Sequence, residues 1–246
     1  DYAISDALPI GFNFVYAGQS YTQFKMSADG FITFNPTASS TVSDLSAANA
    51  TYRPIVAALW DDLDGSVTGS RASYQVTGTA PNRVLTVEWL NWEWRWSANV
   101  PVISFQIKLY ETTGVIEYVY RQEANNTNAT TSSGASIGIN NPTGTGAGSY
   151  LNLNTDVLVP TVSSTTNVTN INVRPANNQV FRFTPPACMY GGSVNVTNIT
   201  YNSATLNLTP AFNLPIELYV GTTAPAATAA ATHTFAANAT TINLTN

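Results

Sequence analysis

The sequence predicts an all-β protein whose main part is a large antiparallel β-sandwich. Apolar and aromatic residues recur at every second position in many short segments, which is the period of a half-buried strand. Turn sequences such as Ala28-Asp29-Gly30 and Asn141-Pro142-Thr143-Gly144 separate these segments. No segment carries a helical stripe. At 246 residues, the chain is long enough for one large sandwich and a smaller second domain.

Strands are expected wherever β-branched and aromatic residues alternate with polar ones. The clearest hairpin spans residues 103–120, because Ile103, Phe105, Ile107 and Leu109 fall on one face and polar residues fall on the other. Gly114 in its turn is expected to adopt a positive φ. In the first part of the chain, the expected strands are Ile10–Tyr16, Tyr21–Met26, Phe31–Phe34, Ile55–Trp60, Ala72–Val76, Val84–Trp96, Val102–Tyr110, Val115–Tyr120, Ser136–Ile139 and Val180–Phe183.

A domain boundary is expected at the proline-rich segment that begins with Thr184 and Pro185. Beyond it, the sequence is rich in Asn, Thr and Ala and has almost no charge. We therefore expect a large β-sandwich domain over residues 1–185 and a second, incomplete domain over residues 186–246. The expected strands of the second domain are Val194–Thr200, Ala204–Thr209, Ile216–Val220, Thr232–Phe235 and Thr240–Leu244.

The charge of the chain argues against several classes of partner. Only 9% of residues are charged, the net charge is −5, and no basic stripe is present. Nucleic-acid binding requires clustered cations, so we expect no nucleic-acid partner. No apolar run approaches the ~20 residues of a membrane span.

The inventory of reactive side chains argues against an enzyme. The chain contains one histidine, His233, and one cysteine, Cys188, and these lie far apart in the sequence. Catalytic triads and most zinc sites need histidine beside a nucleophile or beside further nitrogen and sulfur ligands. We expect no catalytic residues.

Three carboxylates follow the apolar segment that ends at Trp60. Asp61, Asp62 and Asp64 offer hard oxygen ligands, and Gly65 permits a sharp turn, so a Ca²⁺ site is one interpretation. The spacing is not that of an EF-hand. The alternative is structural, with these acids capping turns or pairing with Arg53 and Arg71.

A cluster of tryptophans occupies the segment around residue 92. On a regular strand, Trp92, Trp94 and Trp96 share one face. If that face is exposed, it forms a flat platform for sugar rings or for aromatic residues of a partner. If it is buried, it belongs to the thick core of a large sandwich.

Asn-x-Thr acceptor sequences for N-glycosylation recur along the chain. We regard the loop positions Asn125 and Asn128 as the best candidates for carrying a glycan. The alternative is that a Thr-rich strand protein generates such sequences without any sugar. The remaining positions are Asn49, Asn167, Asn195, Asn198, Asn207, Asn238 and Asn243.

Six blocks of the first domain, taken in order, form a recognisable pattern: Gly11–Phe14, Tyr21–Met26, Ser27–Phe34, Ile55–Asp64, Ser104–Gly114 and Phe181–Pro185. Together they resemble the large β-sandwich that precedes fibronectin type III modules in secreted surface proteins of Bacteroidetes. The first three blocks are also similar to the nidogen-like extracellular domain. Residues 190–246 resemble the first five strands of a fibronectin type III domain, although Asn207-Leu208-Thr209 replaces the usual core tryptophan.

The resemblance implies a secreted or cell-surface protein of structural or adhesive type, without catalytic residues. Its expected partners are other surface proteins or copies of itself, in a fibre or matrix, and glycans are a further candidate. The competing interpretation is a carbohydrate-binding module that uses the Trp92, Trp94 and Trp96 face. Solvent exposure of those rings separates the two interpretations.

Overall fold

A computed structural model of the chain divides into two compact units, residues 1–188 and residues 189–246. The structure describes residues 3–38, 45–46, 52–95, 99–125, 134–185, 193–209, 216–218, 233–235 and 240–245. The described residues contain no α-helix and therefore no helix that could cross a membrane.

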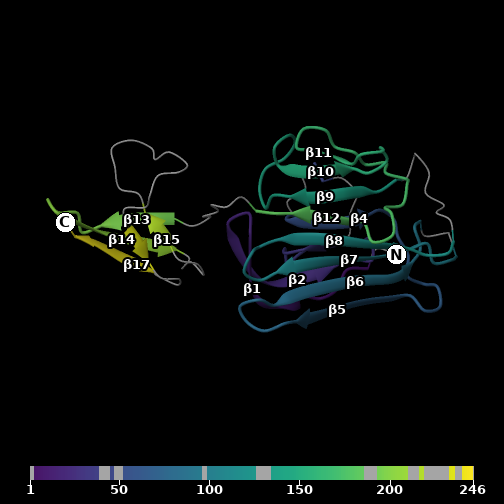
Figure 1. The fold of residues 1–246 in the computed structure, drawn as a ribbon, viewed down its shortest axis with the longest axis horizontal. Helices are drawn as coiled ribbons and strands as arrows, with labels where there is room; N and C mark the ends of the chain where they lie inside the picture. The colour runs from purple at the N-terminus through teal and green to yellow at the C-terminus, as the bar shows by residue number, and fades with distance from the viewer. Residues whose placement is uncertain are drawn as a thin grey trace. The chain divides into compact units, whose positions relative to one another are not determined.

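The first unit contains a seven-stranded sheet in the order β1-β2-β3-β4-β9-β10-β11, and its described pairings are antiparallel (Figure 1). β4 lies at its centre and is buried at every residue, because it is covered on both faces. The strands are β1 (Leu8–Tyr16), β2 (Gln19–Met26), β3 (Phe31–Thr33), β4 (Ile55–Trp60), β9 (Ser136–Asn140), β10 (Tyr150–Asn154) and β11 (Thr161–Ser163).

A five-stranded antiparallel sheet in the order β12-β8-β7-β6-β5 forms the second layer of this unit. Ile103, Phe105, Ile107 and Leu109 of β7 are buried, as the alternating pattern predicts. Gly114 adopts a φ of +63° in the turn that follows, which confirms the positive φ predicted for it. The strands are β5 (Arg71–Thr77), β6 (Val84–Trp92), β7 (Ile103–Tyr110), β8 (Ile116–Gln122) and β12 (Val180–Phe183).

The core lies between the two sheets, and the hydroxyl groups of two buried tyrosines form hydrogen bonds across it. The Tyr118 hydroxyl donates to the Gly138 carbonyl oxygen at 2.8 Å, and the Tyr120 hydroxyl donates to the Ala58 carbonyl oxygen at 2.6 Å. Both tyrosines come from β8, whereas their acceptors belong to the opposite sheet. Each buried hydroxyl is therefore satisfied, and each bond ties one sheet to the other.

The predicted all-β sandwich is confirmed, but two of its strands were not expected from the sequence. β10 and β11 fall in a region without an assigned strand, because a buried polar residue obscures the pattern of β10 and β11 is only three residues long. Asn152 of β10 is 1% exposed, and its side chain bonds both backbone groups of Val168. Such satisfied polar groups occupy positions that a hydrophobicity pattern assigns to the surface.

The predicted strand Val84–Trp96 was too long. β6 ends at Trp92, and the β6–β7 register shifts between Trp89 and Trp92. Asn91 and Arg95 have φ values of +56° and +80°, which are incompatible with a continuous strand. Trp92 and Trp94 are therefore placed by irregular backbone rather than by simple alternation.

The second unit holds a three-stranded antiparallel sheet in the order β13-β14-β17 and a two-stranded pair, β15-β16. Leu206, Leu208 and Ile242 form its small buried cluster. Asn198 has a φ of +51°, and β13 ends before it, earlier than predicted. The strands are β13 (Ser193–Thr197), β14 (Ser203–Thr209), β15 (Ile216–Leu218), β16 (His233–Phe235) and β17 (Thr241–Thr245).

Candidate functional site

The candidate site begins at the tight contact between the Gly30 turn and the end of β4. Gly30 has a φ of +80°, and a Cβ atom there would lie 2.1 Å from the Leu59 carbonyl oxygen. The Leu59 backbone N–H donates to the Gly30 carbonyl oxygen at 3.2 Å. Only glycine combines this φ with so close an approach. The contact fixes the backbone that leads into Asp61.

Asp61 is a buried hydrogen-bond acceptor. The residue is 6% exposed, and its carboxylate accepts bonds from the Trp94 indole N–H and from the Asp62 backbone N–H, each at 2.8 Å. Burial raises the pKa of the Asp61 carboxyl, and the two hydrogen bonds oppose that rise. Asp61 thus connects the end of β4 to the tryptophan segment.

Asp64 and Gly65 also contact the tryptophan segment. The backbone groups of Asp64 and Glu93 form an antiparallel bridge, with N to O distances of 2.8 and 3.4 Å. A Cβ atom on Gly65 would lie 2.3 Å from the Trp92 ring. The Asp64 carboxylate accepts a bond from the Ser66 backbone N–H at 2.7 Å, as in an Asx-turn.

Asp29 is a site residue that the sequence did not indicate. It is 3% exposed, and its Oδ1 has no hydrogen-bond partner among the described residues. Burial, together with the nearby Asp62 carboxylate, raises the pKa of Asp29 to about 7. The sequence shows Asp29 as an ordinary turn residue, because only the fold brings it beside residues 61–62.

The calcium interpretation rested on Asp61, Asp62 and Asp64. Within the described residues, no group of three His, Cys, Asp or Glu side chains is placed to hold a metal ion. Asp61 and Asp64 act instead as the hydrogen-bond acceptors described above. The expected arginine partners lie elsewhere: the buried Arg53 donates to the Leu45, Asn141 and Ser149 carbonyl oxygens, and the exposed Arg71 pairs with Glu88. The calcium site stays a prediction.

Two of the three tryptophans in the predicted binding face are interior. Trp92 is 6% exposed and Trp94 is 0% exposed. Their indole N–H groups are already bonded, Trp92 to the Ala28 carbonyl oxygen at 3.0 Å and Trp94 to Asp61. Trp96 lies outside the described residues. The structure therefore places Trp92 and Trp94 in the core, where they offer no platform to a sugar ring.

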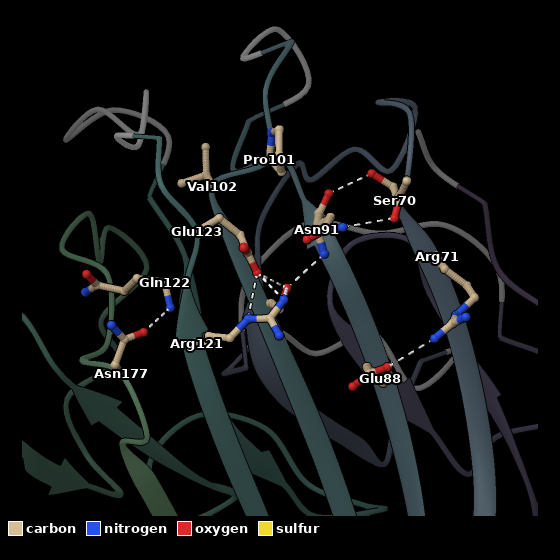
Figure 2. Close-up of polar contacts among 12 residues, drawn as sticks. Ser70, Arg71, Glu88, Asn91, Pro101, Val102, Arg121, Gln122, Glu123 and Asn177 are labelled. Atoms are coloured by element: carbon tan, nitrogen blue, oxygen red, sulfur yellow. Dashed lines mark hydrogen bonds and ion pairs between the residues drawn. The ribbon is translucent and has the colours of Figure 1, made fainter.

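A polar surface adjoins the tryptophan segment at the same end of the five-stranded sheet (Figure 2). The Ser70 hydroxyl donates to the Asn91 carbonyl oxygen at 2.6 Å, and the Asn91 backbone N–H donates to Ser104 Oγ at 2.8 Å. The Ser104 hydroxyl donates to Glu123 Oε1 at 2.5 Å, and Arg121 pairs with the same oxygen at 2.6 Å. This chain of bonds crosses the sheet from the start of β5 to the end of β8.

Paired charges gather along this surface. Arg71 pairs with Glu88 at 3.8 Å, and Glu88 also accepts a bond from the Gln106 side-chain amide at 2.7 Å. The Arg71 and Arg121 side chains are 65% and 56% exposed, whereas their acidic partners are largely covered. The surface therefore presents arginine and amide donors to solvent, which suits hydrogen bonding to a polar partner. We call residues 70, 71, 88, 91, 104, 106, 121 and 123 the polar surface.

Asn125, one of the two predicted glycan acceptors, borders this surface. Its side-chain amide donates to the Pro101 carbonyl oxygen at 2.8 Å, and its own carbonyl oxygen accepts a bond from Arg174. Arg174 also donates to the Val102 and Glu123 carbonyl oxygens, so it holds these segments together. Asn128 lies outside the described residues. Glycosylation stays a prediction at both positions.

The two packed antiparallel sheets, with the buried Asp61–Trp94 contact at the end of β4, define the first unit as a β-sandwich. A sequence model of the NIDO-related family matches residues 1–185, and the chain belongs to this family. The match confirms the nidogen-like part of the resemblance seen in the sequence. Searches of curated proteins and of solved structures found no match.

Proposed function

We propose that this chain is a non-enzymatic, extracellular structural or adhesive protein that binds other surface proteins or its own copies. The observation that carries the proposal is the NIDO-related match over residues 1–185, because domains of this family are typically extracellular. The sequence resemblance to secreted surface proteins of Bacteroidetes supports the same placement.

The use of the carboxylates supports a role without catalysis. Asp61 and Asp64 hold the backbone at the end of β4, and Glu88, Glu117 and Glu123 each pair with an arginine. General acid–base catalysis requires a titratable group within reach of a bound substrate. These carboxylates serve folding and surface pairing instead.

The strand order of the second unit supports the proposal that it is a module of the fibronectin type III type. Its sheet order, β13-β14-β17, with the β15-β16 pair intervening in sequence, matches the A-B-E sheet of immunoglobulin-like sandwiches. A small β-module after a large sandwich suits a protein that extends from a surface. We propose that the polar surface of the first unit makes the adhesive contact, since its donors are exposed and already ordered.

Cross-linking mass spectrometry on intact producing cells tests this function. We expect protease treatment of intact cells to remove the protein and cross-links to join it to surface proteins or to its own copies. Recovery in the cytoplasm, protected from the protease, would refute the proposal.

Matched charge reversals test the contact surface. The double variant Arg71→Glu/Arg121→Glu should lose the cross-links made through the polar surface. The control is Arg182→Glu, at another part of the same sheet, since the Arg182 side chain is 57% exposed and also pairs with a glutamate. Equal loss in both variants would show that the polar surface is not the contact.

A further inference from the structure

We propose that the first unit self-associates through strand β11, with a second copy of the chain as the partner. The proposal rests on the edges of the two sheets and does not depend on the proposed adhesive role. The seven-stranded sheet has two more strands than the five-stranded sheet, and β10 and β11 extend beyond β12 (Figure 1). This overhang leaves apolar side chains in water.

The exposed side chains form a patch around β11. Val162 is paired with the buried Leu153, so it lies on the core-facing side of the sheet, yet it is 59% exposed. The loop before it exposes Leu158 fully and Val159 by 72%. We call Leu151, Val157, Leu158, Val159, Val162 and Val173 the β11 patch. Exposed apolar residues that gather in this way mark an interaction site.

The β11 edge differs from the other three sheet edges of this unit in the described residues. β5 carries Arg71 and β12 carries Arg182, and charges on an edge oppose the addition of another strand. β1 is interrupted by a register shift after Pro9, and Arg83 covers its Gly11 carbonyl oxygen at 2.7 Å. β11 reads Thr-Val-Ser and has neither a charge nor a bulge. Its three-residue length limits the addition of another strand, but it lacks the charges and the register shift that protect the other edges.

The distribution of charge indicates that the partner is a copy of the same chain. In a twofold contact, the same patch of both copies meets itself, so a patch with charges of one sign would repel its copy. Between residues 150 and 173, the only charged residue is Asp156. Its carboxylate accepts bonds from the Asn172 and Val173 backbone N–H groups at 2.9 and 3.0 Å, which also holds Val173 beside the loop.

Antiparallel pairing of β11 with its own copy places the central residue, Val162, opposite itself. The two copies then share one continuous sheet, and the β11 patches of both copies cover each other. Directly opposed residues in an antiparallel pair have Cα atoms about 4.5–5.5 Å apart, which falls within the span of a disulfide. This geometry permits a direct test.

Sedimentation velocity of the whole chain under reducing conditions gives the first test. We expect concentration-dependent dimers in the wild type and an association at least about tenfold weaker in Val162→Lys and in Leu158→Lys. Val180→Lys is the matched control, because Val180 is 45% exposed on the β12 edge, and it should associate as the wild type does. A monomeric wild type, or a dimer that Val162→Lys leaves intact, would overturn the proposal.

Disulfide trapping gives the second test and does not depend on the lysine variants folding well. In a Cys188→Ser background, Val162→Cys should form a covalent dimer under mild oxidation, whereas Val180→Cys should remain monomeric. Equal trapping at both positions would indicate random collision and would refute pairing through β11.

Discussion

The indole N–H of Trp94 donates a 2.8 Å hydrogen bond to Oδ2 of Asp61, and both residues are buried. This bond joins the end of the central strand β4 to the segment that follows β6, across a separation of 33 residues. It gives the buried Asp61 carboxylate a hydrogen-bond donor in the tryptophan-rich segment.

Trp94→Phe should destabilise the protein by about 2 kcal/mol at pH 8, because a buried carboxylate loses a charge-assisted donor. Urea unfolding measures the loss. Trp89→Phe is the control, since Trp89 is equally buried but donates to the neutral Ser27 carbonyl oxygen, and its lost bond should cost about 1 kcal/mol. Identical losses at pH 8 would show that the charge of Asp61 contributes nothing.

The buried Asp29 should make stability depend on pH. Its pKa is about 7 in the folded protein and 3.8 in its ordinary state, so the folded protein holds the proton more tightly. The free energy of unfolding should therefore fall as the pH rises from about 4 to about 7, by at most about 4 kcal/mol. Urea unfolding across this range measures the fall.

Asp29→Asn should remove most of this pH dependence and should be more stable than the wild type at pH 8. Asp62→Asn should lower the pKa of Asp29, because it removes a neighbouring negative charge. Carboxyl NMR titration reads that change directly. The exposed Asp6→Asn variant serves as the control and should retain the wild-type pH dependence. An unchanged slope in Asp29→Asn would contradict the assignment.

Gly30→Ala should cost more than about 3 kcal/mol or prevent folding, because the new Cβ would overlap the Leu59 carbonyl oxygen. Gly146→Ala provides the comparison. Gly146 also has a positive φ, of +69°, but a Cβ there meets no atom within 4 Å. That variant should therefore cost only the backbone strain, about 1–2 kcal/mol. Thermal unfolding separates the two, and equal losses would argue against the steric explanation.

The calcium interpretation of Asp61, Asp62 and Asp64 predicts that millimolar Ca²⁺ raises the melting temperature of the wild type and that this rise vanishes in Asp62→Ala. The structural alternative, in which Asp61 and Asp64 serve as hydrogen-bond acceptors, predicts no shift in either protein. Differential scanning fluorimetry with and without a chelator distinguishes the two outcomes.

The sequence by itself determined the fold class and most strand positions. Alternation along β7 identified the buried face correctly, and the turn at Gly114 was identified from its residue types, because both depend on local spacing. Only the tertiary structure decided that Trp92 and Trp94 are buried and that Asp29 lies near Asp61 and Asp62.

The physical reason is that burial and pairing depend on which segments the sheets bring together. Strand β10 escaped prediction because Asn152 is buried and bonded to Val168, a contact that no local pattern encodes. The open edge of β11 likewise depends on the order of strands in the sheet and not on the residues Thr161–Ser163 themselves. Local sequence therefore specified the strands, whereas the assembly of the two sheets specified which side chains remain available to a partner.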